Sequence, residues 1–108
     1  MAYNLQLAER IRSELDGIPV VEKKMFGGVG FLLNGNMACG VNKDDLILRV
    51  NPAKHTALLK KPHVRPFDMT GKPMKGWLLI DAAGVKTEKQ LSMWVKEGVQ
   101  FASSLSPK

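Results

Sequence analysis

The first apolar residues of the chain recur at helical spacing. Residues three and four apart share a helix face, and the residues that do so here are Leu7, Ala8, Ile11 and Leu15. Asn4 is suited to cap the N-terminus of such a helix, and Asp16-Gly17 provides a stop signal before Pro19. The pattern predicts a helix over about residues 4–16.

Between residues 20 and 50 the apolar period changes from helical to alternating. Three runs alternate, namely Val29-Phe31-Leu33, Met37-Cys39-Val41 and Leu46-Leu48-Val50. Asn34-Gly35 stands between the first two runs and favours a type I′ hairpin turn, because both of its central positions need a positive φ. Together with residues 20–26, these runs predict a meander of about four antiparallel strands, which need only short turns.

The segment after residue 50 predicts a short helix and one or two strands. Asn51-Pro52 is typical of an N-cap followed by proline at the first helical position, so we expect a helix through about Lys60. Residues 74–81 are expected to form a strand, and an extra short strand is expected near Phe67. The side chains predicted on one side of the strand are Met74, Leu78 and Ile80, and those on the other are Lys75, Trp77 and Leu79.

A capping box begins the last predicted helix. The Thr87 hydroxyl and the Gln90 amide can satisfy each other's exposed backbone donors. The apolar stripe that follows consists of Leu91, Trp94, Val95, Gly98, Phe101, Ala102 and Leu105. Because glycine inside a helix costs roughly 1 kcal/mol relative to alanine, Gly98 predicts close packing against a neighbour.

These elements predict one domain over residues 1–108 in the order α-β-β-β-β-α-β-(β)-α. We expect an α+β fold of two layers, in which a mostly antiparallel sheet of about five or six strands carries helices on one face. The elements do not alternate in the βα manner of a nucleotide-binding sheet.

Composition limits the classes of protein that remain. The 108 residues carry 16 basic and 10 acidic side chains, a net charge of +6. A chain of this length buries roughly 65% of its unfolded surface, enough for one core. No apolar run reaches membrane length and no signal peptide is visible, while a single cysteine excludes an intramolecular disulfide. We expect a cytoplasmic protein with no membrane contact, no metal and no cofactor.

Possible catalytic and phosphate-binding residues favour structural roles. Gly27-Gly28-Val29-Gly30 leads into a strand and hairpin, so no helix N-terminus is available to bind a phosphate. Glycine here favours a bulge or a close approach between a helix and the sheet. Cys39 with His55 or His63 would offer a nucleophile and a base, but its place in an alternating run favours a buried, protonated thiol. We therefore expect no enzymatic activity.

Basic residues suggest one possible binding surface. Positive charge interleaved with aromatic residues is typical of nucleic-acid binding. The candidate basic surface consists of Lys23, Lys24, Lys60, Lys61, Arg65, Lys72 and Lys75. The alternative is that these side chains are scattered and serve solubility. Nucleic-acid binding requires that they converge on one face.

Apolar residues on the second face of the predicted sheet suggest another surface. This candidate apolar interface consists of Leu32, Ile47, Trp77 and Leu79. If it is exposed, it would bind a protein partner or a second copy of the chain as a homodimer. The alternative is that short helices or loops cover it.

Several motifs resemble one known family. They run from Met25-Phe26-Gly27-Gly28, through Gly30-Phe31-Leu32, Asn34-Gly35 and Gly40-Val41, to Arg65-Pro66-Phe67-Asp68, Pro73-Met74 and Gly76-Trp77. Over about residues 5–100 the chain is similar to the TfoX N-terminal domain family, whose longer members regulate natural competence in bacteria. The resemblance implies a two-layer α+β fold in a cytoplasmic bacterial protein.

The same resemblance carries over no catalytic residues. The motif positions that it implies to be structural are Met25, Phe26, Gly27, Gly28, Asn34, Gly35, Met74, Gly76 and Trp77. The longer regulators have a second, C-terminal domain, whereas this chain ends at Lys108, so we expect the fold to transfer better than the regulation of competence. Two functions remain open: a non-enzymatic regulatory or adaptor domain that contacts proteins, and a transcription-related nucleic-acid-binding domain.

Overall fold

The computed structural model describes residues 3–25, 27–67 and 74–107, with the side chain of Met25 excepted. The helices are α1 (Leu5–Glu14), α2 (His55–Leu59) and α3 (Glu88–Ser104), with short 3-10 turns η1 (Pro52–Lys54) and η2 (Ala82–Val85). The strands are β1 (Val20–Met25), β2 (Gly28–Leu33), β3 (Asn36–Asn42), β4 (Asp45–Arg49), β5 (Val64–Pro66) and β6 (Trp77–Ile80).

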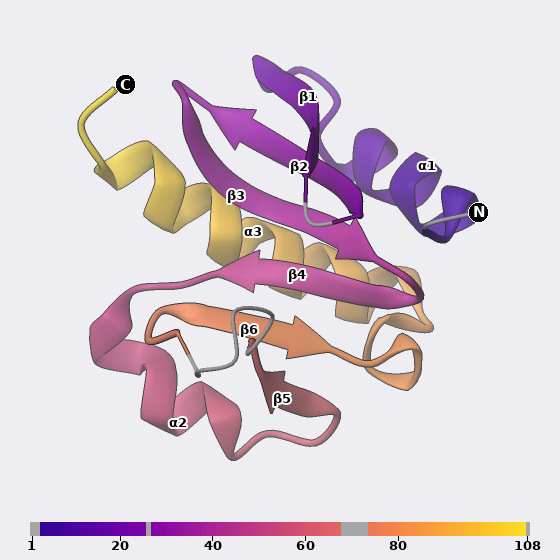
Figure 1. The fold of residues 1–108 in the computed structure, drawn as a ribbon, viewed down its shortest axis with the longest axis vertical. Coiled ribbons are helices and arrows are strands. Elements are labelled where there is room, and N and C mark those ends of the chain that lie inside the picture. Colours follow the sequence, from indigo (N-terminus) through magenta and orange to yellow (C-terminus); the bar gives the residue numbers. More distant parts are fainter. Residues whose placement is uncertain (1–2, 26, 68–73, 108) are drawn as a thin grey trace.

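The described strands form one antiparallel sheet of six strands in the order β1-β2-β3-β4-β6-β5. The later strand β6 pairs with β4, so β5 forms one edge and β1 the other. Helix α3 crosses the sheet behind β3 and β4, with α1 on the same side (Figure 1). The predicted α+β class, antiparallel sheet and order of elements are confirmed.

Local sequence signals form the turns and caps that they predict. Asn34 and Gly35 have φ values of 53° and 82°, as a type I′ turn requires. The Asn4 side chain accepts the backbone N–H of Leu7 at 3.0 Å, and the reciprocal Thr87–Gln90 capping box is present. These elements depend on neighbours in sequence, which is why the sequence predicts them.

The main core lies between the sheet and the helices. Its completely buried side chains include Ile11, Phe31 and Leu48. Gly98 of α3 lies so close to β3 that a Cβ there would stand 2.3 Å from the carbonyl oxygen of Ala38. The predicted close packing at Gly98 is confirmed.

A β-bulge in β3 corrects one predicted alternation. Phe31 pairs with Cys39 while Leu32 pairs with Met37, so Ala38 is an extra residue. An extra residue shifts the side chains that follow to the other face. Cys39 therefore belongs to the main core, whereas Met37 packs on the opposite face, and the prediction that they share a face is wrong.

The start of β6 corrects a second prediction. The strand begins at Trp77, because Gly76 has a φ of 89° and the Trp77 N–H donates to the Met74 carbonyl in a turn. Met74 packs with Trp77 and Leu79, not on the side of Leu78 as predicted.

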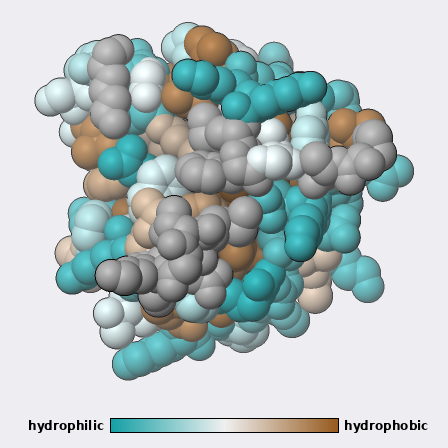
Figure 2. Space-filling view, viewed as in Figure 1, coloured by the Kyte–Doolittle hydropathy of each residue, from teal (hydrophilic) through white to brown (hydrophobic). Residues whose placement is uncertain are grey.

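The second face of the sheet is covered by the chain itself. Ile47 and Leu79 are 0% and 4% exposed, beneath the fully buried Phe67. Leu32 and Trp77 are half-buried around them. The free apolar interface expected here is therefore mostly a second, smaller core, and in Figure 2 the apolar atoms visible on this side form separate small areas. Phe26 and residues 68–73, Lys72 among them, lie outside the described residues.

Candidate functional site

The structure divides the predicted basic surface between the two edges of the sheet. Lys23 and Lys24 are exposed on β1, whereas Arg65 lies on β5 at the other edge. Lys60 and Lys61 follow α2, which packs against β5 and β6. Strands about 4.8 Å apart place the edges of this sheet about 24 Å from one another. The convergence that nucleic-acid binding requires is therefore not found among the described residues of this set.

Arg65 is also engaged by acidic side chains. Its Nε donates to Asp81 at 2.6 Å, and its Nη2 forms an ion pair with Asp45. These carboxylates raise the pKa of the Arg65 guanidinium, and they compensate its charge. Lys75 is exposed and stands just before β6.

The possible nucleophile and one possible base occupy structural positions. Cys39 is completely buried, and burial raises the pKa of its thiol to about 12, so the reactive thiolate does not form at neutral pH. His55 Nδ1 accepts the backbone N–H of Gly76 at 2.9 Å in a buried contact. In the part of the chain that is described, no three His, Cys, Asp or Glu side chains are placed to hold a metal ion.

The glycine motif shapes the backbone. Gly27 has a φ of 73°, and a Cβ at Gly28 would lie 1.8 Å from the carbonyl oxygen of Val41. The structural role favoured for this motif is therefore found at Gly28, but the close approach joins β2 to β3 and not a helix to the sheet.

None of the helices in the described part of the chain has the length and apolar character that a membrane span needs.

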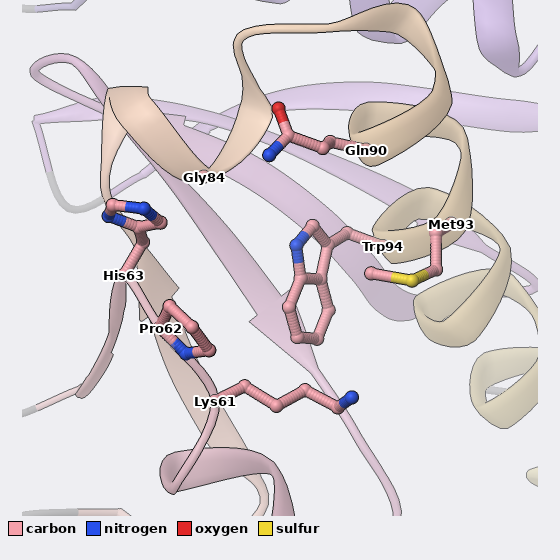
Figure 3. A pocket seen from close by; sticks show the side chains of 7 residues that line it. All are labelled: Lys61, Pro62, His63, Gly84, Gln90, Met93 and Trp94. Carbon is pink, nitrogen blue, oxygen red and sulfur yellow. The ribbon is translucent and has the colours of Figure 1, made fainter.

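A pocket of about 180 Å³ lies between α3, η2 and the segment that joins α2 to β5. The residues that line it are Lys61, Pro62, His63, Gly84, Gln90, Met93 and Trp94. Figure 3 shows the Trp94 indole extending from α3 toward residues 61–63, with Met93 beside it and the Lys61 side chain below the ring.

Backbone geometry keeps the walls of this pocket close together. His63 has a φ of 67°, and its carbonyl accepts the N–H of Asp81 at 2.8 Å. A Cβ at Gly84 would lie 2.8 Å from the His63 Cβ. Glycine at this position therefore allows η2 to approach the segment that contains His63. The joining segment is thus fixed beside Trp94.

The floor and the rim of the pocket differ in exposure. Trp94 is 4% exposed and belongs to the main core, whereas Met93 is 50% exposed. None of the seven described lining residues is a carboxylate, and the exposed Lys61 provides positive charge.

The comparison with known proteins identifies the family. The profile of the TfoX N-terminal domain matches residues 15–102. The chain belongs to the TfoX N-terminal domain family. The resemblance carried by the Met25-Phe26-Gly27-Gly28 and Gly76-Trp77 motifs is therefore confirmed, and the match includes every residue that lines the pocket. No curated protein and no solved structure matches the chain.

The sequence pattern of this TfoX N-terminal domain did not reveal the pocket. It placed Trp94 in a core stripe, which is confirmed, and Lys61 in the basic surface. One signal was Met93, an apolar residue outside the stripe of α3. That signal carries little information, because single exposed apolar residues are common.

Proposed function

We propose that this TfoX N-terminal domain is a non-enzymatic regulatory or adaptor module that binds another protein. The observation that carries the proposal is the pocket beside Trp94, where an apolar recess meets the exposed Met93 and Lys61. An apolar recess with a polar rim is the arrangement by which proteins anchor a partner's side chain.

The placement of the reactive side chains supports a binding role. Cys39 is buried and protonated, and His55 accepts a backbone hydrogen bond, so these two residues serve the fold. The division of Lys23 and Lys61 between different edges favours protein contact over a continuous track for a nucleic-acid backbone.

The edge strand β1 favours a different protein over a second copy of the chain. Its exposed Lys23 and Lys24 place positive charge along this edge of the sheet. Lysines on an edge strand are a common protection against pairing with the edge of a second copy. We expect the isolated domain to sediment as a monomer in analytical ultracentrifugation.

Site-specific photo-cross-linking in the source cells tests the proposal. A benzophenone side chain in place of Met93 is expected to link covalently to one protein. Val21, an apolar residue 68% exposed on β1 at one edge of the sheet, is the matched control position and is expected to give no such product. Cross-linking at neither position, or equally at both, contradicts binding through the pocket.

Fluorescence anisotropy with labelled single-stranded and duplex oligonucleotides tests the other candidate function. We expect no binding even at low salt, where the net charge of +6 helps most. Micromolar binding that falls steeply with salt and is lost in a Lys60→Ala, Lys61→Ala double variant would instead establish a nucleic-acid-binding domain.

A further inference from the structure

We infer that the pocket beside Trp94 binds an acidic segment of the partner protein, with one apolar side chain of that segment inserted between Met93 and Pro62. This inference rests on the proposed protein-binding function and adds the chemistry of the partner. Its support is the size of the pocket, the nature of its lining and the charge around it.

The size of the pocket limits its occupant. Its volume is about 180 Å³, whereas sites for small molecules and cofactors usually enclose roughly 300–1,000 Å³. A recess of this size accommodates a single side chain better than a cofactor. An anchor side chain from a protein segment therefore fits this pocket.

The lining selects an apolar anchor. Pro62, Met93 and Trp94 supply apolar surface, and a methionine thioether adapts its shape to different partners. Because Trp94 is only 4% exposed, its ring is unavailable for stacking against a nucleic-acid base, which needs an open aromatic face. The recess favours an aliphatic side chain over a base.

The charge around the pocket is positive. Lys61 lines it and Lys60 is adjacent, while Lys89 and Lys96 lie four residues before and three residues after Met93, on the same exposed face of α3. Within residues 3–25, 27–67 and 74–107, none of these four lysines forms an ion pair.

The acidic residues of α3 near the pocket are already engaged. Glu88 pairs with Arg10 at 3.0 Å, and Glu97 pairs with Lys54 at 3.1 Å. The lysines therefore leave uncompensated positive charge around an apolar recess, which complements glutamate or aspartate on either side of an apolar side chain.

A second pocket on α3 provides a contrast. It encloses about 210 Å³ and is lined by Asn51, Lys54, Glu97, Gln100, Phe101 and Ser104. Its one lysine is paired with its one glutamate, so this pocket offers no net charge to a partner. The Trp94 pocket is the better docking site of the two.

Binding of a defined peptide tests the inference. The probe is a fluorescein-labelled peptide with glutamates on both sides of one central leucine, titrated against the full chain by fluorescence anisotropy. We expect saturable binding that weakens at least about tenfold when the leucine is replaced by serine or the glutamates by lysines. Equal binding of all three peptides would overturn the inference.

Charge reversals at matched positions locate the binding site. Lys61→Glu at the pocket and Lys23→Glu on β1 change the net charge equally, and both positions are exposed. We expect Lys61→Glu to weaken peptide binding at least about tenfold and Lys23→Glu less than about twofold. Equal effects of the two variants would show non-specific attraction and overturn the inference.

Met93→Asp is a second pocket variant that does not depend on the lysine. Because Met93 is half exposed, we expect the variant to fold, with unchanged far-UV circular dichroism, and to lose peptide binding. Retention of binding by folded Met93→Asp would overturn the inference.

The proposed function and the acidic-segment inference can be overturned separately. Cross-linking at Met93 without saturable peptide binding would overturn the acidic-segment inference and leave protein binding in place. Peptide binding without any cross-linked protein would support the chemistry of the pocket and contradict the proposed cellular role. Direct binding of a labelled oligonucleotide that is lost in Lys61→Glu but not in Lys23→Glu would overturn the inference and replace the protein segment with a nucleic acid.

Discussion

The two faces of the sheet are both apolar, but they are covered in different ways. One face is closed by α1 and α3, whose apolar stripes belong to one large core. The other is closed around Ile47 and Leu79 by Phe67 and by Met74, which belong to no helix. The difference indicates that two equally buried faces need not be equally rigid, because a small cluster with few buried apolar contacts opens at lower free energy than a large one.

Substitutions of two neighbouring buried residues of β4 are expected to reduce the free energy of unfolding the most. Leu48 points into the main core and Ile47 into the second one, and both are completely buried. We expect Leu48→Ala to reduce the free energy of unfolding by about 4 kcal/mol and Ile47→Ala by about 2 kcal/mol, because the smaller cluster can collapse around the lost atoms. Urea denaturation measures both, and equal losses would show that the second face is as rigid as the first.

Overpacking at Gly98 tests the close contact between α3 and β3. A Cβ there would lie 2.3 Å from the Ala38 carbonyl oxygen and 2.9 Å from Leu48 Cδ1. We expect Gly98→Ala to cost about 2 kcal/mol in urea denaturation, in spite of the helix propensity that it gains. Lys96→Ala, at an exposed position of the same helix, is the control and should be nearly neutral. A stabilised Gly98→Ala variant would contradict the contact.

Substitution of His55 tests the hydrogen bond that holds the turn before β6. His55→Ala leaves the buried N–H of Gly76 without its acceptor, so we expect a loss of roughly 1–2 kcal/mol. The effect should centre on the second face, where acrylamide quenching of Trp77, measured in a Trp94→Phe background, should increase. His55→Asn keeps an acceptor near the position of Nδ1 and should restore part of the stability. Equal losses in the two variants would argue against this hydrogen bond.

Removal of the ion pair between Arg12 and Glu22 is expected to change the free energy of unfolding the least. Arg12 Nε lies 2.6 Å from Glu22, joining α1 to β1, and the hydrogen bond to Arg12 lowers the pKa of Glu22. A carboxyl with a lowered folded-state pKa contributes stability above its unfolded-state pKa, and this contribution is lost as the pH falls through the folded-state value.

We expect Glu22→Gln to cost less than about 1 kcal/mol at pH 7, because the pair is exposed to solvent. The difference from the unmodified chain should disappear in acid and shrink in high salt. Thermal unfolding of both proteins across pH measures it. A difference that persists in acid would assign the effect to packing and not to the charge.

The sequence by itself determined the local elements of this protein. The Asn34-Gly35 turn, the Thr87–Gln90 capping box and the helical stripe of α3 depend on residues within a few positions of each other. The family motifs in turn predicted the α+β class, which the fold confirms.

Only the tertiary structure decided where these elements meet. The bulge at Ala38 moves Met37 to the second face, and the strand order separates Lys23 from Lys61. The pocket exists because the fold brings a loop residue with a positive φ, His63, and Trp94 of α3 to the walls of the same recess. Such contacts join residues far apart in the chain. Hydrophobic periodicity predicts which side of a helix or strand is buried, but it does not predict which other element packs against that side.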